Sequence, residues 1–388
     1  MTLPASGTIS LSAVQSEFGG SNPVGMDEYY RGGSYVSVNN TSIPTSGTIS
    51  LSNYYNGAKY VTGVNWWDRG TVASWPTDSG WVSSVDYGNG LTFLSGGSAT
   101  YAYSSDGNTW TVSTAIRSLW GASTSGTYNT ITQILWTGSY YIAAGSKGYI
   151  ARSTNGTSWT NITTLRSTTW GTTTDCYALA TNGSRIVVVG QSVHVAYSDD
   201  NGANWTYVTL PSSSNTLESV AWNGSVFCAV GEFGTCFTSP DGATWTANSG
   251  VSTVFGGQHA TYITAFGSTF VAGSSGPGGA GSSNAMIATS TNGVSWTYRT
   301  ALTIGSSDYV SGIATNGSGQ YVAVTYLNNA ATSSDLVTWT TNTNLSSIFP
   351  VATTQDTCGL AWNGTRYITS AVQFSVSSGY TLPVATSV

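Results

Sequence analysis

Short apolar runs alternate with turn residues along most of the chain, and the pattern recurs seven times. Each copy reads as an apolar strand, a tight turn containing Gly and a second apolar strand, as in LESVAWNGSVFCAVG. Asn-Gly between alternating apolar runs is a strong hairpin signal, because a type I′ turn needs two residues at positive φ. The predicted hairpins are Val85–Gly96, Ile134–Gly145, Tyr177–Gly190, Leu217–Gly231, Ile263–Gly273, Gly312–Val324 and Gly359–Ser370.

A second recurring element follows six of the hairpins. It reads Ser, then Asp or Asn, then usually Gly, and ends in Trp; we call these segments the box turns. The Trp residues recur at about 46 residues, within the range of about 40–50 for a four-stranded propeller blade. Asp or Asn before Gly can accept hydrogen bonds from its own turn, and the Trp ring can pack against the neighbouring blade. The predicted structural residues are Asp106, Trp110, Asn155, Trp159, Asp200, Trp205, Asp241, Trp245, Asn292, Trp296, Asp335 and Trp339.

Together these elements predict an all-β chain that is nearly free of helix. Seven hairpins and six box turns predict a seven-bladed β-propeller of four-stranded blades over residues 57–388, preceded by a small N-terminal segment, residues 1–56. The last unit, from Cys358, has no box turn. Because a propeller must close to protect its sheet edges, we expect Lys59–Trp75 to pair with the last blade.

Composition excludes several classes of function. Hydrophobic residues make up 40% of the chain, enough for a core, but charged residues only 7%, against a typical value of about 25%. Ten Lys and Arg residues cannot form a basic stripe, so nucleic-acid binding is not expected. The chain shows neither a signal peptide nor an apolar run of about 20 residues, so membrane insertion is not expected. The cysteines are expected to be buried, and Cys228 and Cys236 could face each other across a hairpin.

The box turns resemble those of Asp-box, or BNR-repeat, propellers, whose consensus is Ser-x-Asp-x-Gly-x-x-Trp. Ser198–Trp205 (SDDNGANW) matches the full spacing, four other copies match a shortened form, and Leu336 replaces the Gly in the last. The resemblance covers roughly residues 57–388. It implies a propeller but no single function, because such propellers occur in sialidases, photosystem assembly factors, sorting receptors and viral appendages.

The first 56 residues carry a second resemblance. Leu3–Gly20 and Ile43–Ala58 share the element SGTISLS and flank Met26–Val36 (MDEYYRGGSYV). This arrangement resembles the N-terminal segment of many bacteriophage virion proteins. About 56 residues can hardly build much core alone, so the segment is expected to fold by docking on a partner or on its own copies. The predicted anchoring interface comprises Phe18, Tyr29, Tyr30, Arg31, Tyr54 and Tyr55.

The resemblance implies a virion structural protein, a tail or tail-fibre component that displays its propeller for host attachment or assembly. Its expected partners are other tail, baseplate or fibre proteins, with a host-surface glycan or protein as a further candidate, and a homo-oligomer is expected in the particle. The protein would be made in the host cytoplasm without a signal peptide. The alternatives are a capsid decoration or neck-fibre protein, and an Asp-box hydrolase of the sialidase type.

The hydrolase alternative finds little support in the sequence. Sialidase chemistry on this fold would need an Arg triad, a Tyr–Glu pair and an Asp acid. Only Glu218 and Glu232 lie in the propeller region, and each reads as a strand or hairpin residue; His194 and His259 are isolated. No Ser-His-Asp set or metal-ligand spacing stands out, so no catalytic, cofactor or metal site is predicted. Convergent acids and arginines at the central mouth would favour the hydrolase.

Aromatic residues beside Gly or Pro precede several blades. The connections between blades emerge on one face, so these rings either form an exposed platform for sugars or a partner, or plug the gaps between blades. The Gly-rich stretch Gly273–Gly281 lies within one blade and is expected on the opposite face. The candidate platform residues are Trp75, Trp120, Trp170, Phe255 and Phe349.

Overall fold

The structure is a computed structural model of the whole chain, and one compact unit spans Trp66–Ser387. The six predicted anchoring residues, Phe18 to Tyr55, lie outside the described residues. The structure describes residues 66–76, 81–121, 129–210, 215–275, 285–302, 308–342, 344–349, 356–375 and 379–387.

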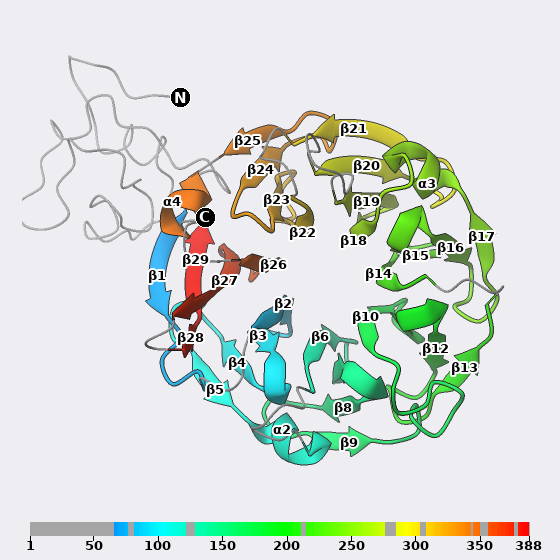
Figure 1. Ribbon diagram of the computed structural model, residues 1–388, viewed down its shortest axis with the longest axis horizontal. Coiled ribbons are helices and arrows are strands. Elements are labelled where there is room, and N and C mark those ends of the chain that lie inside the picture. Colours follow the sequence, from blue (N-terminus) through cyan, green and yellow to red (C-terminus); the bar gives the residue numbers. More distant parts are fainter. Residues whose placement is uncertain are drawn as a thin grey trace, which may run out of the picture. The chain divides into compact units, whose positions relative to one another are not determined.

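Seven antiparallel sheets surround a central axis (Figure 1), so the predicted seven-bladed β-propeller is confirmed. In each of the first six blades the strands run in chain order from the innermost to the outermost. Blade 1 comprises β2 (Val82–Gly88), β3 (Leu91–Gly96), β4 (Tyr101–Ser104) and β5 (Thr111–Ser113). Blade 2 comprises β6 (Ile131–Trp136), β7 (Tyr141–Gly145), β8 (Ile150–Ser153) and β9 (Thr160–Ile162). Blade 3 comprises β10 (Cys176–Thr181), β11 (Ile186–Gly190), β12 (Val195–Ser198) and β13 (Thr206–Val208).

The next three blades repeat the arrangement. Blade 4 comprises β14 (Leu217–Trp222), β15 (Phe227–Gly231), β16 (Cys236–Ser239) and β17 (Thr246–Asn248). Blade 5 comprises β18 (Ala260–Phe266), β19 (Thr269–Ser274), β20 (Met286–Ser290) and β21 (Thr297–Ala301). Blade 6 comprises β22 (Val310–Thr315), β23 (Tyr321–Thr325), β24 (Ala330–Ser333) and β25 (Thr340–Asn342).

The last blade joins the two ends of the propeller unit. Its order is β26 (Asp356–Trp362), β27 (Tyr367–Ser375), β29 (Pro383–Ser387) and β1 (Trp67–Thr71), and β28 (Gly379–Thr381) pairs with β27. Trp67 lies opposite Thr386, and Arg69 Nε donates to Thr386 Oγ1 at 2.7 Å. The predicted closure by Lys59–Trp75 is therefore confirmed for Trp67–Thr71, while residues 59–65 lie outside the described residues. The pairing protects the edge of the last sheet.

Short helices in the connections are the main departure from the predicted strand-only pattern. They are α2 (Ala115–Trp120), α3 (Gly250–Phe255) and α4 (Asn344–Ile348). Gly121 and Gly256 end α2 and α3 in the left-handed conformation, which glycine adopts without a steric penalty. No helix among the described residues is long and apolar enough to cross a membrane.

The two ends of the propeller carry different loops. The hairpins that join the first and second strands of a blade lie at the same end of the propeller as the box turns, which join the third and fourth strands. We call this end the box face. The other end, the connection face, holds the links between blades and the turns between second and third strands; α2 packs there beside η3 (Gly97–Ala99). Since β19 ends on this face, where Ser275 bridges to Tyr309, the opposite-face prediction for Gly273–Gly281 is wrong; most of that stretch lies outside the described residues.

The Asn-Gly hairpins form as predicted but use two kinds of turn. Asn89 and Gly90 both have positive φ, at 46° and 81°, as a type I′ turn requires. At Asn182 the turn is longer, because the strands pair only from Thr181 and Ile186 outward. There the Asn182 side chain accepts hydrogen bonds from the N–H groups of later residues in the turn, so the residue acts through its side chain rather than its φ.

The box turns share one hydrogen-bond pattern. In the first, Ser104 Oγ donates to Asp106 Oδ1 at 2.9 Å and accepts from Gly107 N at 2.8 Å. The equivalent two bonds recur at Ser153, Ser198, Ser239, Ser290 and Ser333. Leu336 keeps the bond to Ser333 by adopting a φ of 61°. The predicted turn chemistry is therefore confirmed in all six copies.

Hydrophobic cores lie between neighbouring blades, and the box Trp residues contribute to them. Trp245 of blade 4 packs with Val187 and Ala178 of blade 3 and is 8% exposed. Its indole Nε1 donates to Gly242 O at 3.0 Å. A Cβ added at Gly242 would lie only 2.7 Å from Val187 Cγ2, which shows how closely the turn approaches the preceding blade.

The aromatic residues before the blades are buried. Their exposed fractions are 6% or less, and each joins a core between blades. The platform interpretation is therefore wrong and the plug interpretation is confirmed, because these rings fill the space between diverging sheets. The residues are Trp75, Trp120, Trp170, Phe255 and Phe349.

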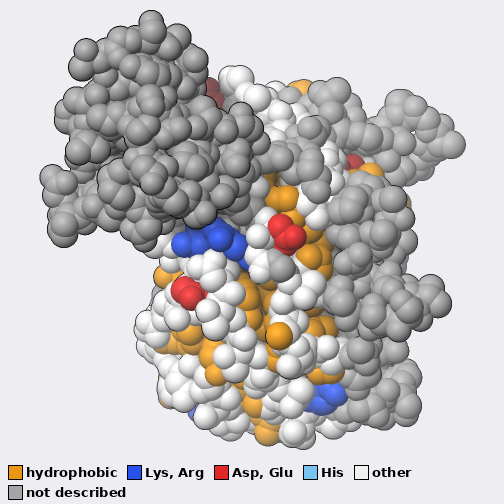
Figure 2. Space-filling model, turned by 90° about the vertical axis from the view of Figure 1, so that its left-hand side faces the viewer, with side chains coloured by type: hydrophobic (Ala, Val, Ile, Leu, Met, Phe, Trp, Pro, Cys, Tyr) orange, Lys and Arg blue, Asp and Glu red, His pale blue; other side chains and the backbone are white. Residues whose placement is uncertain are grey.

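The outer wall on the side of β1 and β29 shows mostly uncharged side chains and only a few charged groups (Figure 2). This agrees with the charged fraction of 7% for the whole chain. Ser, Thr and Asn side chains make such a surface polar without making it charged. Charged groups that do cluster therefore stand out from the rest of the molecule.

Candidate functional site

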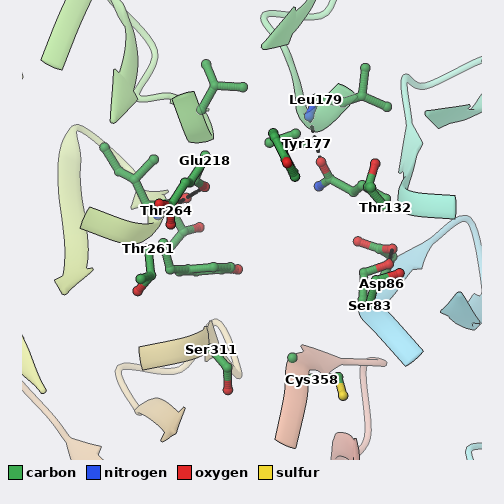
Figure 3. A pocket seen from close by; sticks show the side chains of 18 of the residues that line it. Ser83, Asp86, Thr132, Tyr177, Leu179, Glu218, Thr261, Thr264, Ser311 and Cys358 are labelled. Carbon is green, nitrogen blue, oxygen red and sulfur yellow. Dashed lines mark hydrogen bonds between the residues drawn. The ribbon is translucent and has the colours of Figure 1, made fainter. Parts of the chain in front are cut away.

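A cavity of about 1290 Å³ occupies the centre of the propeller. The innermost strands of all seven blades line it, with side chains such as Asp86, Tyr177, Glu218, Thr261 and Cys358 directed toward the axis (Figure 3). The ionisable side chains in this lining are mainly acidic. They comprise Asp86, Asp175, Glu218, Glu232 and His259, with the side chains of Tyr and Cys.

A β-bulge at the start of each innermost strand shapes this lining. In blade 4, for example, the register shifts between Leu217 and Ser219, so Glu218 is the extra residue. A bulge interrupts the ladder and redirects its residue. Most equivalent positions hold a hydroxyl. The residues at or within the bulges are Ser83, Thr132, Tyr177, Glu218, Thr261, Ser311 and Cys358.

Side chains next to the bulges connect neighbouring blades. Ile134 N donates to Asp86 Oδ2 at 3.0 Å, and Leu179 N donates to Gln133 Oε1 at 2.6 Å. Ile263 N donates to Ser219 Oγ at 3.1 Å in the same way. These N–H groups belong to the innermost strand of each sheet, which has no further strand of its own sheet on the axis side, so the neighbouring blade supplies their partners. Polar residues on the axis thus serve the packing of blades.

Asp86 is one of these connecting residues. Burial raises the pKa of its carboxyl to about 6, and the hydrogen bonds from Ile134 and from the Ser84 hydroxyl only partly offset the loss of solvation. Asp86 Oδ2 accepts both hydrogen bonds, from Ile134 N at 3.0 Å and from Ser84 Oγ at 2.7 Å. Its geometry is therefore accounted for by a structural role.

A different arrangement exists at the connection-face end of the cavity, in blades 4 and 5. His259 Nδ1 lies 3.3 Å from Glu218 Oε1. Glu232, in η6 (Glu232–Gly234), accepts a hydrogen bond from Thr216 N through Oε2 at 2.7 Å. One ligand atom from each of the three residues lies within 4.8 Å of the other two. We call Glu218, Glu232 and His259 the channel triad.

The environment of the channel triad perturbs its central carboxyl. Burial raises the pKa of Glu218 to about 7, and the charge of His259 partly opposes this shift. The nearby Glu232 raises it further. The side chains of Glu218 and His259 are 25% and 38% exposed, so the pair remains accessible from the cavity.

Exposed aromatic rings lie on the same face as the triad. Phe233 is 61% exposed and its ring lies edge-on to His259 at 4.9 Å. Trp81 and Tyr177, which line the cavity, are 42% and 36% exposed. We call Trp81, Tyr177 and Phe233 the rim aromatics. Phe233 has a φ of 54°, which is uncommon for a bulky side chain.

The local sequence pattern does not link the parts of this site. The two glutamates do lie in a strand and in a turn between strands, as expected, but the description of His259 as isolated is wrong. His194 contacts the rings of Trp170 and Tyr207 instead. The rim aromatics were also missed, because nothing in the local pattern separates an exposed ring from a buried one. Only the packing of blade 5 against blade 4 brings the three residues together.

The cysteines mostly behave as expected. Cys228 Sγ and Cys236 Sγ face each other across β15 and β16 at 3.8 Å, and both are buried, as is Cys176. Cys358 differs, since it is only half-buried and lines the central cavity. Its place at a bulge explains the difference.

Comparisons with known proteins relate the chain through its fold. No family model and no curated protein sequence matches it. Among solved structures, "YCF48 bound to D1 peptide" is similar with a TM-score of 0.58 and 14% identity, over 82% of this chain and 96% of that one. YCF48 from Cyanidioschyzon merolae has a TM-score of 0.57 and 16% identity, over 82% and 98%.

A third similar structure is PorZ of Porphyromonas gingivalis, a surface component of the type-IX secretion system. Its TM-score is 0.50 at 12% identity, over 82% of this chain and 39% of that one. Identities this low show a shared fold and leave the chemistry of the site to be argued from its own residues. The chain is a seven-bladed β-propeller with a mainly acidic central cavity.

Proposed function

We propose that this protein is a non-enzymatic structural component of a bacteriophage tail or tail fibre. In this proposal residues 1–56 attach the chain to other tail, baseplate or fibre proteins, and an Asp-box propeller is displayed as a binding head. The observation that carries the proposal is the repeated SGTISLS element with MDEYYRGGSYV between its copies. The recurrent box turns support the Asp-box assignment through their sequence spacing and shared hydrogen bonds.

The rim aromatics support a binding role for the connection face. Large rings that remain exposed beside a cavity are typical of surfaces that contact a partner. The partner would be a host-surface glycan or protein. A propeller of similar fold is described as bound to a peptide, the D1 peptide, so peptide binding has a precedent on this architecture.

The sialidase-type alternative gains one observation and loses another. Glu218 and Glu232 do converge, as paired acids in a hydrolase would. However, the ionisable groups along the described cavity wall are acids, one His, and Tyr and Cys side chains, without arginine. An acidic wall repels the carboxylate of a sialic acid rather than binding it. The geometry therefore favours binding over this hydrolysis.

A truncated chain tests the attachment role. A variant beginning at Tyr60 removes the N-terminal segment but retains β1, so the propeller can still close. We expect it to melt cooperatively like the full chain but to be missing from assembled phage particles. Normal incorporation of this truncated chain into virions would contradict the proposal. Labelling of intact particles would then distinguish a tail position from a capsid or neck position.

A rim variant tests the binding role separately. Trp81→Ala combined with Tyr177→Ala removes two exposed rings from the connection face. Binding of the propeller to host cells or isolated surface polysaccharide should fall, while the melting temperature changes little. Tyr298→Ala, which removes an exposed ring from an outer strand, is the matched control. Equal binding by both variants would exclude the rim as the contact surface.

A further inference from the structure

The channel triad can be compared with equivalent positions in the other blades, because the propeller repeats its own scaffold. At the bulge position, Ser83 Oγ donates to Ser95 O at 3.1 Å and Thr132 Oγ1 donates to Ala144 O at 3.1 Å. Thr261 Oγ1 donates to Val310 O at 2.9 Å. Glu218 occupies this position with a carboxylate, which cannot donate when ionised. The fold uses hydroxyl groups here, so it does not require Glu218.

Glu232 exceeds its structural requirement in a similar way. In blade 2 the equivalent residue is Ser146, whose Oγ accepts from Thr130 N at 3.1 Å. Glu232 Oε2 accepts the equivalent bond from Thr216 N at 2.7 Å. One oxygen therefore meets the need of the turn. The turn does not need the second oxygen of the Glu232 carboxylate, and this side chain approaches Glu218 and His259.

His259 contributes to the fold only through its backbone at the equivalent point. Ser275 N donates to His259 O at 3.0 Å, as Gln191 N does to Asp175 O and Ser146 N does to Thr130 O. These equivalent residues have different side chains, so the backbone bond does not require a histidine. His259 places an imidazole nitrogen 3.3 Å from the Glu218 carboxylate. Three side chains that the scaffold does not need thus meet at one point.

We propose that Glu218, Glu232 and His259 form a binding site for a divalent first-row transition metal ion such as Zn²⁺. Two carboxylate oxygens and one imidazole nitrogen are a donor set typical of these ions. Mg²⁺ and Ca²⁺ prefer oxygen donors alone. Ligand bonds of about 2.0–2.2 Å require the donors to lie closer than the present limit of 4.8 Å.

The charge of the triad supports a cation. The two carboxylates carry two negative charges when ionised, and a protonated His259 can balance only one of them. A divalent ion would balance both carboxylates while His259 binds as a neutral ligand. Any further coordination position would face the cavity that all three residues line.

Phe233 acts as a positioning residue for His259. Its ring contacts the imidazole edge-on at 4.9 Å, and its φ of 54° fixes the direction of the side chain. Ser98 and Ser192 occupy the same turn position with φ of 50° and 56°, so the turn does not depend on an aromatic residue. Hydrogen-bonded partners of a metal ligand commonly change metal affinity by about 10-fold to 100-fold, and a ring contact should have a smaller effect.

Titration of the full-length protein with Zn²⁺ tests the site by calorimetry, and Co²⁺ provides ligand-field absorption bands that report coordination. We expect one bound ion per chain. His259→Asn, Glu218→Gln and Glu232→Gln should each weaken binding by at least about 10-fold, while melting temperatures without metal stay near that of the wild type. Mg²⁺ and Ca²⁺ should not compete at equal concentration.

Two further variants keep the test decisive. His194→Asn removes the other histidine, on the same face of blade 3, and should leave Zn²⁺ affinity unchanged. Phe233→Ser should weaken Zn²⁺ binding severalfold and alter the Co²⁺ spectrum without unfolding the turn. Absence of Zn²⁺ binding, or wild-type affinity in His259→Asn and Glu218→Gln, would overturn the proposal. If a triad variant misfolds, Phe233→Ser and His194→Asn still test the proposed site. An ion bound at the triad should respond to Phe233→Ser and not to His194→Asn. An ion bound elsewhere on the surface should not respond to Phe233→Ser.

Discussion

The box face and the connection face of this propeller follow opposite rules. On the box face the same Ser-centred hydrogen bonds recur in six turns. On the connection face, equivalent positions carry Ser98, Lys147, Ser192 and Phe233 with similar backbone angles and unrelated side chains. Side chains recur where they make the turn, and they vary where the backbone alone makes it. The varied face is therefore where a site can arise without cost to the fold.

The largest expected difference concerns a box tryptophan. Trp245→Ala should destabilise the protein by about 3–5 kcal/mol, because a ring that is 8% exposed leaves a cavity between blades 3 and 4. Chemical denaturation of purified protein measures the loss. The half-buried Trp339, whose Nε1 has no hydrogen-bond partner, should show a smaller loss on the same substitution. An unchanged unfolding midpoint for Trp245→Ala would contradict the packing described here.

A smaller loss is expected from a box serine. Ser239 is fully buried, accepts from Gly242 N at 2.7 Å and donates to Asp241 at 3.0 Å. Ser239→Ala leaves the Gly242 N–H without this partner and should cost about 1–3 kcal/mol. The same substitution at Ser225, in a hairpin turn outside the box turns, is the control and should have little effect. Equal denaturation midpoints for the two variants would remove the distinction between these turns.

The box aspartates should make stability depend on acidic pH. Hydrogen bonds from Thr109 N, Asn108 N and the Ser104 hydroxyl outweigh burial and hold the pKa of Asp106 at about 2, below the ordinary value of 3.8. A lowered pKa in the folded state adds stability above pH 4 that is lost as the pH falls toward 2. Asp106→Asn should reduce this loss, since Asn155 makes the same turn with an amide. Melting temperatures of both proteins between pH 2 and 5 test this; parallel curves would contradict it.

The smallest effect on stability is expected on the connection face. Phe233→Ser should change the free energy of unfolding by no more than about 0.5 kcal/mol, because the ring is 61% exposed and Ser98 and Ser192 occupy the same position elsewhere. Denaturant titration beside Trp245→Ala gives the comparison directly. A loss as large as that of the Trp variant would mean that the connection face is as dependent on its side chains as the box face.

The repeating part of this fold was predictable because its signals are local. An Asn-Gly hairpin or a Ser-Asp-Gly turn forms from neighbouring residues, so seven blades and the closing role of β1 could be inferred from sequence spacing. The type of turn was less predictable. At Asn182 side-chain hydrogen bonds stabilise a longer turn than the two residues suggest.

The candidate site depended on contacts between distant residues. The sequence around Trp120 and Trp170 does not distinguish a buried ring from an exposed one, yet packing between neighbouring blades buries both. Trp81 and Phe233 remain exposed, although their sequence context gives no warning of it.

By itself, the sequence determined the number of blades and the chemistry of the box turns, because hydrophobic alternation and turn formation act over a few residues. The tertiary structure decided which charged groups meet. Glu218, Glu232 and His259 come from a strand bulge, a turn and a connection between blades, and only the packing of blade 5 against blade 4 places them together. Packing around a closed ring brings such groups to one point, and no pattern of neighbouring residues encodes that distance.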